Sequence, residues 1–328
     1  MKKSLYLFSA LAIVISLSVS SCKKKKEEKA QQEQNDKTQK EGATASQESR
    51  EAQAENENSV NEINQVISDN PKLSGRPADG TQARPTGICG LTIDSITQGN
   101  GVMLLTYNGT TCDNRTRTGS IKLSLQGYTT GTRWKNVGAV IKVEYTNYKV
   151  TRASDGASMM FNGTQFLTNV SGGNWFTLLI LQNQPSLVTT ITGSNLVVTY
   201  QDNTTATYNI NRRLTYTISG AVITVKGEGI GNNGTYTDLE NFGTTRIGDA
   251  FTSRVSTPII WNTTCGAGAP LQGVLEIAVP AKNLALTATY GIDVNGNPVT
   301  VGPNQCAYGW KYLWSVNTAS NTQIVKYN

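Results

Sequence analysis

Between residues 186 and 227 the chain alternates apolar and polar residues in short runs, with only a few residues between one run and the next. The runs are Leu187–Thr192, Leu196–Tyr200, Thr204–Ile210, Leu214–Ser219 and Val222–Lys226. Alternation is typical of half-buried strands, and such short connections join antiparallel neighbours. A parallel sheet needs crossovers of about a dozen residues or more, for which this stretch has no room. The sequence therefore predicts an antiparallel meander here.

The strand pattern continues on both sides of this stretch. Strands are expected over residues 87–93, 102–107, 119–125, 137–150, 158–170, 175–181, 252–261, 271–279, 284–290, 308–316 and 322–327. The chain holds 31 Gly and 13 Tyr, and it is rich in Thr, Asn and Val, which suits strands joined by tight turns. Good helix formers are scarce after residue 90. We therefore predict an all-β fold over residues 88–328, a large antiparallel meander or sandwich.

Two related lobes, residues 88–190 and 191–328, are one form that this fold could take. In each half a cysteine, Cys112 or Cys265, is followed by a short loop, a glycine (Gly119 or Gly273) and an alternating strand. The correspondence favours an internal duplication. Chance similarity in a chain rich in Thr and Gly is the alternative.

The first residues have the layout of a secretory signal. Lys2 and Lys3 precede an apolar run, Leu5–Val19, that is too short to span a bilayer comfortably. Val19-Ser20-Ser21-Cys22 resembles a bacterial lipobox, in which the cysteine is lipidated and becomes the first residue of the mature protein. We predict a lipoprotein signal peptide over residues 1–21, and export of everything that follows.

Residues 22–87 are predicted to be a lipidated, disordered linker. Residues 23–58 are almost wholly polar, so they cannot offset the entropy cost of ordering. Within the linker, Val60, Ile63, Val66 and Ile67 stand at helical spacing before Pro71, which predicts a short amphipathic helix that is marginal by itself. As a random coil, this linker would hold the domain on the order of 40 Å from a membrane.

The cysteine count indicates disulfides. With Cys22 taken by the lipid, four of the five cysteines remain, and an even remainder in an exported protein points to pairing. Of the three possible pairings we favour the sequence-local one, Cys89–Cys112 and Cys265–Cys306. The chain has no C-x-x-C and no histidine, so a metal site is not expected.

The absence of histidine excludes Ser-His-Asp and Cys-His machinery and imidazole acid–base chemistry. The formal net charge is +6, and Lys2, Lys3 and the Lys23–Lys26 run contribute part of it. No basic run is interleaved with aromatics as in a nucleic-acid module. We therefore predict no catalytic site, no cofactor and no nucleic-acid partner.

Three aromatic residues are candidates for glycan binding. Trp310, Tyr312 and Trp314 alternate with Lys311 and Leu313, so the three rings share one face of a strand. One interpretation is a stacking platform, because flat aromatic faces pack on the apolar faces of sugar rings. The other, which we favour, is that the rings fill the core, since tryptophan is usually well buried.

Acidic residues offer weaker candidates. Asp238 and Glu240 share a face if extended, and Glu228 lies nearby in sequence, so they could supply the carboxylate pair of a glycosidase. Acidic pairs on a solvated strand face are the commoner case. The stretch Asp293–Asn297 has oxygen-bearing side chains but lacks the later bidentate glutamate of a Ca²⁺ loop, so a hairpin turn is predicted.

The arginines Arg115, Arg117, Arg212 and Arg213 have two interpretations. They could bind acidic glycans, or they could protect strand edges against pairing with another sheet.

Several of these features together resemble a group of β-rich lipoproteins of Bacteroidota envelopes. The resemblance covers roughly residues 88–315 and is carried by the Cys22 lipobox, the Cys89/Cys112 pair, the strand start Arg115-Thr-Arg117-Thr-Gly119-Ser-Ile, the strand end Asn147-Tyr148-Lys-Val150 and the Cys265/Cys306 pair. It implies an outer-membrane-associated lipoprotein and supplies no activity. The loop Gly291–Gln305 is longer here than in that pattern. Asp94-Ser95-Ile96 also resembles the O-glycosylation site of exported proteins from these bacteria, which makes Ser95 a candidate for modification.

We therefore expect a non-enzymatic binding or scaffolding protein that the lipid anchors to the outer membrane. The expected partner is a glycan or another envelope protein, and the periplasmic and surface faces of the membrane both stay open. The alternative is a carbohydrate-active hydrolase that uses an Asp/Glu pair.

Replacing Cys22 with serine tests the anchor. The Cys22→Ser protein should lack the lipid, because the thioether needs the cysteine sulfur, and it should leave the membrane fraction. Fractionation with metabolic labelling by a fatty acid measures both. Processing and membrane retention like those of the wild type would show that the lipobox assignment is wrong.

Overall fold

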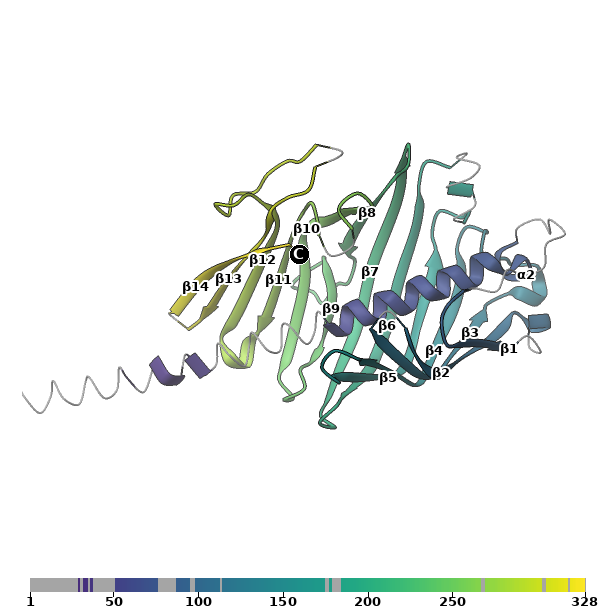
Figure 1. The fold of residues 1–328 in the computed structure, drawn as a ribbon, viewed down its shortest axis with the longest axis horizontal. Coiled ribbons are helices and arrows are strands. Elements are labelled where there is room, and N and C mark those ends of the chain that lie inside the picture. The colour runs from purple at the N-terminus through teal and green to yellow at the C-terminus, as the bar shows by residue number, and fades with distance from the viewer. Residues whose placement is uncertain are drawn as a thin grey trace, which may run out of the picture.

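The structure is a computed structural model, and it describes residues 29, 32–34, 36–37, 51–75, 87–94, 98–112, 114–174, 177–178, 184–266, 269–302, 305–317 and 319–327. Most of these residues belong to one antiparallel sheet of 14 strands (Figure 1). The strands are β1 (Leu91–Asp94), β2 (Val102–Cys112), β3 (Arg115–Leu125), β4 (Ala139–Arg152), β5 (Ser158–Asn169), β6 (Leu187–Tyr200), β7 (Thr205–Ser219), β8 (Val222–Gly229), β9 (Leu239–Thr244), β10 (Ala250–Asn262), β11 (Gln272–Val279), β12 (Leu284–Ile292), β13 (Gly309–Val316) and β14 (Ala319–Lys326). The prediction of an all-β antiparallel meander is confirmed.

The main helix among the described residues covers residues 51–69. Shorter helical elements include α2 (Pro71–Ser74) and the 3-10 turns η1 (Gln98–Asn100), η2 (Tyr128–Thr130) and η3 (Pro280–Lys282), and residues 32–34, 36–37 and 177–178 are also helical. Among the described residues, no helix combines the length and the apolar character that crossing a membrane requires.

Strand order in the sheet follows the chain from β1 to β8 and from β10 to β14, with one irregularity. One part of β10 pairs with β8 and the other part with β9, and β7 is divided between the same two strands. The two short strands therefore lie end to end and together fill the place of one strand between β7 and β10.

Strands β6 and β7 are longer than the sequence pattern predicted. The connection expected between the strands Leu187–Thr192 and Leu196–Tyr200 is instead a bulge inside β6, where the register shifts between Gly193 and Leu196. Asn195 adopts a φ of 54° at the bulge, and its backbone N–H donates to Asn209 Oδ1 at 3.1 Å. The bulge shifts the alternation of apolar and polar residues by one position, so a different set of residues faces inward beyond it. The interrupted alternation is the reason why the sequence pattern predicts a strand end there.

The long helix crosses the inner face of the sheet, in front of the strands in Figure 1. Residues 51–58 are helical, so the assignment of residues 22–87 as a disordered linker is wrong for the part from 51 to 75. Ile63 and Ile67 are fully buried and join the same core cluster as the inward residues of β2 to β7. The sheet supplies the apolar contacts that this helix lacks by itself.

The helix ends before Pro71, as the sequence predicts. Asn70 Oδ1 accepts the backbone N–H of Leu73 at 3.1 Å, which caps α2 with Pro71 at its first turn. The Leu73 carbonyl then accepts the backbone N–H of Trp134 at 2.8 Å. Trp134 is buried, so this junction fixes the end of the helix to the loop between β3 and β4.

Both predicted disulfides are present. Cys89–Cys112 joins the segment before β1 to the end of β2, with the Cα atoms 6.2 Å apart. Cys265–Cys306 joins the loop after β10 to the segment before β13, with the Cα atoms 5.6 Å apart. The sequence-local pairing is therefore confirmed. Cys22, Ser95 and the signal peptide of residues 1–21 lie outside the described residues.

Truncation of Ile63 tests the contribution of the helix to stability. Ile63→Ala removes a fully buried side chain and should lower the free energy of unfolding by about 2–5 kcal/mol through lost transfer energy and a cavity. Asn61→Ala, on an exposed position of the same helix, should change it by less than about 0.5 kcal/mol. Urea unfolding followed by circular dichroism measures both. Equal, small effects would show that the helix does not hold the sheet.

Candidate ligand-binding site

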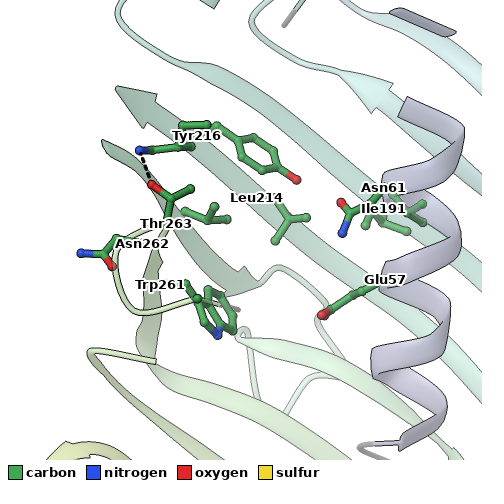
Figure 2. Close-up of a pocket in the computed structure, with 12 residues that line it drawn as sticks. Glu57, Asn61, Ile191, Leu214, Tyr216, Trp261, Asn262 and Thr263 are labelled. Atoms are coloured by element: carbon green, nitrogen blue, oxygen red, sulfur yellow. Dashed lines mark hydrogen bonds between the residues drawn. The ribbon is translucent and has the colours of Figure 1, made fainter. Parts of the chain in front are cut away.

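A cavity of about 310 Å³ lies between the long helix and strands β6, β7, β8 and β10 (Figure 2). Cavities that hold small molecules commonly measure about 300–1,000 Å³. The residues that line it are Glu57, Val60, Asn61, Ile191, Leu214, Tyr216, Ile223, Val225, Trp261, Asn262, Thr263 and Gly266. The cavity is therefore large enough for a small ligand or for part of a longer one.

The walls of the cavity are mostly apolar because strand alternation points one set of side chains inward. Leu214 and Tyr216 are inward positions of β7, and Val225 pairs with both Tyr216 and Trp261 across the strands. Directly paired residues project on the same side of a sheet. Aliphatic side chains and two aromatic rings thus form one continuous surface.

Trp261 owes its position to a glycine on the neighbouring strand. A Cβ added at Gly227 would lie 2.8 Å from the indole of Trp261, so the ring lies over the space that Gly227 leaves open. Trp261 also packs against the cluster formed by β10 to β13. This one ring therefore belongs both to the pocket and to the next part of the inner face.

A polar network closes the helix side of the pocket. Arg212, buried on β7, donates from Nη1 to Glu57 Oε1 at 2.7 Å, and its Nε lies 3.8 Å from Glu240 Oε2. Gln53 Nε2 donates to Glu57 Oε1 and to Glu240 Oε2, both at 3.3 Å. Ser253 Oγ donates to Glu240 Oε1 at 3.0 Å. One buried guanidinium and its partners therefore tie the helix to β7 and β9.

Burial dominates the electrostatics of Glu240. Its side chain is fully enclosed, and this desolvation raises the pKa of the carboxyl, although nearby Arg212 acts to lower it. The negative charge of Glu57 raises the same pKa further. Burial in the folded protein thus disfavours ionisation of the Glu240 carboxyl.

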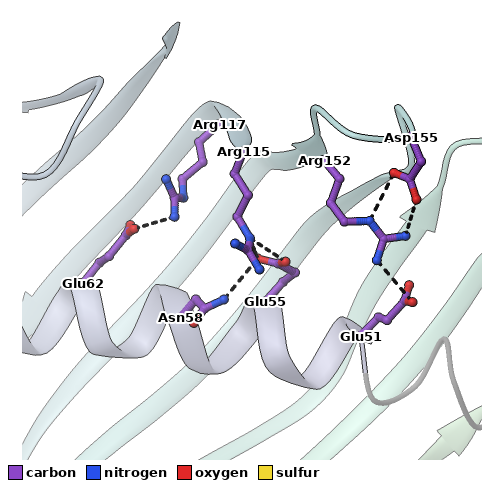
Figure 3. Close-up of polar contacts among 8 residues, drawn as sticks. All are labelled: Glu51, Glu55, Asn58, Glu62, Arg115, Arg117, Arg152 and Asp155. Atoms are coloured by element: carbon purple, nitrogen blue, oxygen red, sulfur yellow. Dashed lines mark hydrogen bonds and ion pairs between the residues drawn. The ribbon is translucent and has the colours of Figure 1, made fainter. Parts of the chain in front are cut away.

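Three further arginines fix the helix along its length (Figure 3). Arg115 Nε lies 2.8 Å from Glu55 Oε1, Arg117 Nη2 lies 3.0 Å from Glu62 Oε1, and Arg152 Nη1 lies 3.2 Å from a Glu51 oxygen. Tyr107 OH also donates to Glu62 at 2.8 Å, and burial raises the pKa of that carboxyl. Because the helix occupies these guanidinium groups, Arg115, Arg117 and Arg212 protect no sheet edge.

The carboxylates suggested by the sequence do not converge. Asp238 lies 3.6 Å from Arg254, whereas Glu240 accepts from Ser253. Ser253 and Arg254 are consecutive in β10, and consecutive strand residues point to opposite faces. Glu228 pairs with Lys226 at 2.7 Å. The prediction that Asp238 and Glu240 share a face is therefore wrong, and the structure instead brings Glu240 near Glu57.

The stretch Asp293–Asn297 forms a turn. Asp293 Oδ1 accepts the backbone N–H groups of Asn295 at 2.8 Å and Asn297 at 2.9 Å. These bonds lower the pKa of the Asp293 carboxyl. The hairpin-turn interpretation is confirmed.

The three aromatic candidates project on one face of β13 and are half-buried. Trp310 and Tyr312 pack against the cluster of β10 to β13, and Trp314 packs against the main core. Sequence analysis missed the pocket itself, because its walls come from five segments far apart in the chain. Its nearest signal was Arg212, a charged residue between two alternating runs.

The fold and site together define an open antiparallel sheet with a helix on its inner face and an apolar pocket beside that helix. Comparisons of the chain with protein-family models, with curated proteins and with solved structures found no match.

The raised pKa of Glu240 predicts that this residue's contribution to the free energy of unfolding depends on pH. As pH rises above the ordinary carboxyl pKa of about 4.3, the unfolded chain releases this proton at a lower pH than the folded chain does, so unfolding becomes more favourable. The free energy of unfolding of the wild type minus that of Glu240→Gln should therefore fall as pH rises from about 4 towards 7. Urea unfolding across this range measures it. Glu228→Gln, on the outer face of β8, is the control, and a difference that stays flat or grows with pH would contradict the assignment.

Proposed function

We propose that this chain is a lipid-anchored protein of the bacterial cell envelope whose folded unit binds an apolar small molecule without chemical turnover. The observation that carries the proposal is the pocket of about 310 Å³. Its walls include Leu214, Val225 and Trp261, and its charged wall residue, Glu57, is paired with Arg212. A pocket of this kind gains affinity from apolar burial and orientation from a few polar groups.

The paired state of the charged residues favours binding over catalysis. A general acid or base must reach the substrate, whereas Glu240 is 3% exposed and accepts from Ser253 and Gln53. Glu57, at the pocket wall, accepts from Arg212 and Gln53. These contacts hold the helix on the sheet, which is a structural task.

The anchor is the part of this proposal that the sequence supports. Val19-Ser20-Ser21-Cys22 resembles a lipobox, and the polar stretch from Lys23 up to the helix has the composition of a solvated spacer. Because residues 51–69 form a helix that packs on the sheet, the proposed spacer ends where this helix begins. It is therefore shorter than the linker of residues 22–87 that the sequence predicts. An outer-membrane location follows from the resemblance to Bacteroidota envelope lipoproteins.

Filling the pocket tests the binding function. Val225→Trp places a large ring in the cavity and should weaken binding of the fluorescent fatty acid cis-parinaric acid by about tenfold or more, which corresponds to about 1.4 kcal/mol. Displacement by palmitate would show that the probe occupies an acyl site. Thr224→Trp, on the opposite face of the same strand, should bind like the wild type.

A second, smaller change in the pocket keeps the test informative if Val225→Trp does not fold. Leu214→Ala enlarges the cavity and should shift the preference towards bulkier ligands, while circular dichroism reports the fold of all three variants. Unchanged probe affinity in a folded Val225→Trp protein would overturn the pocket assignment.

A further inference from the structure

The inner face continues beyond the pocket as a row of aromatic rings on β12 and β13. The ring centroids of Tyr290 and Trp310 lie 6.1 Å apart, and those of Trp310 and Tyr312 lie 5.3 Å apart. All three residues are half-buried. They pack against a buried aliphatic layer that includes Leu275 and Ala288. On this part of the face, half-buried aromatic rings therefore pack against buried aliphatic side chains.

Amide side chains border this row at the edge strand. Tyr312 pairs with Gln323 and Trp314 with Asn321 in the register of β13 and β14, so the two amides project on the same side as the rings. Tyr312 OH donates to Gln323 Oε1, and both amide residues are exposed. Rings for stacking thus lie beside groups that both donate and accept hydrogen bonds.

Formal charge is confined to the other face of these strands. Arg254 pairs in register with Glu276, and Glu276 with Thr287. Lys311 alternates with Trp310 and Tyr312, so it points outward. Among the described residues of β11 to β14, the inward positions carry no Asp, Glu, Lys or Arg. This face therefore suits an uncharged polar group, and it offers no counter-ion to a carboxylate or a phosphate.

Trp261 connects this row to the apolar pocket. It lines the pocket and packs against the same cluster as Tyr290 and Trp310. A ligand with its chain in the pocket could therefore extend across Trp261 onto the aromatic row.

We propose that Tyr290, Trp310 and Tyr312, with Gln323 at their border, form the head-group subsite for a neutral sugar. The ligand class is then an uncharged glycolipid, with an acyl or alkyl chain in the pocket and a sugar ring stacked on the aromatic row. This inference rests on the proposed function and specifies its ligand. A purely apolar ligand would gain little from the amides, and an anionic head group would meet no cation among the described inward residues of β11 to β14.

Matched ligands test the subsite. Dodecyl maltoside below its critical micelle concentration and dodecanol share one chain and differ in the sugar, and isothermal titration compares their affinities for the full chain. The maltoside should bind more tightly by on the order of fivefold, the size expected for an aromatic stacking contact. Trp310→Ala should abolish this difference without changing the dodecanol affinity. Trp310→Phe should retain most of it, and Leu313→Ala, on the outer face, should retain all of it.

The outcomes separate the subsite from the pocket. Equal affinities of the two ligands in the wild type, with both weakened by Val225→Trp, would overturn the sugar subsite and leave the apolar pocket standing. Binding of neither ligand would overturn both. A sugar-dependent difference that survives in folded Trp310→Ala would also overturn the assignment.

Discussion

The contact between the long helix and the inner face of the sheet is the interaction on which the rest of the structure depends. A wide antiparallel sheet with apolar residues on one face must bury that face. The helix does so across β2 to β7 with Ile63, Ile67 and their neighbours, which share one core cluster with the inward strand residues. The same helix cannot be stable alone, because short amphipathic helices are marginal in water. Each element therefore supplies what the other lacks.

Paired charges decide where the helix lies, more than they decide how strongly it binds. Arginines on β3, β4 and β7 meet glutamates spaced along the helix. Exposed ion pairs contribute little free energy, but removal of one partner from a buried pair is costly, so the buried Arg212 with Glu57 and Glu240 fixes the helix to β7 and β9. Beyond this fixed point the helix leaves β8 and the end of β10 uncovered, and the pocket lies there.

Much of this architecture could be predicted from residue patterns. Alternation and short connections predict the meander, and the four cysteines that remain when Cys22 is set aside predict the two disulfides. Local sequence patterns did not predict the structure where contacts between residues far apart in the sequence determine it. Arg212 lies in the connection expected between the strands Thr204–Ile210 and Leu214–Ser219, and its pairing with Glu57, 155 residues away in sequence, accounts for its buried place inside β7.

The helix boundary was missed for a related reason. Residues 51–58 carry glutamates and amides, which read as solvated spacer when no partner is known. The sheet provides those partners: Arg115 for Glu55 and, within the core, Tyr145 for Asn56, whose Nδ2 donates to the tyrosine OH at 3.4 Å. A polar segment can thus be ordered when its polar groups are matched one by one, and composition alone does not carry that information.

The division of the inner face into two parts follows from the reach of the helix. Over β2 to β7 its aliphatic side chains cover the strands, and the inward residues there are mostly aliphatic or buried tyrosines. Over β10 to β13 the inward layer is aliphatic below and aromatic above, with Tyr290, Trp310 and Tyr312 packed on Leu275 and Ala288. Large rings can shield such a floor and still present polar edges to a ligand. The residue types of β12 and β13 therefore agree with the sugar subsite that we propose on this face.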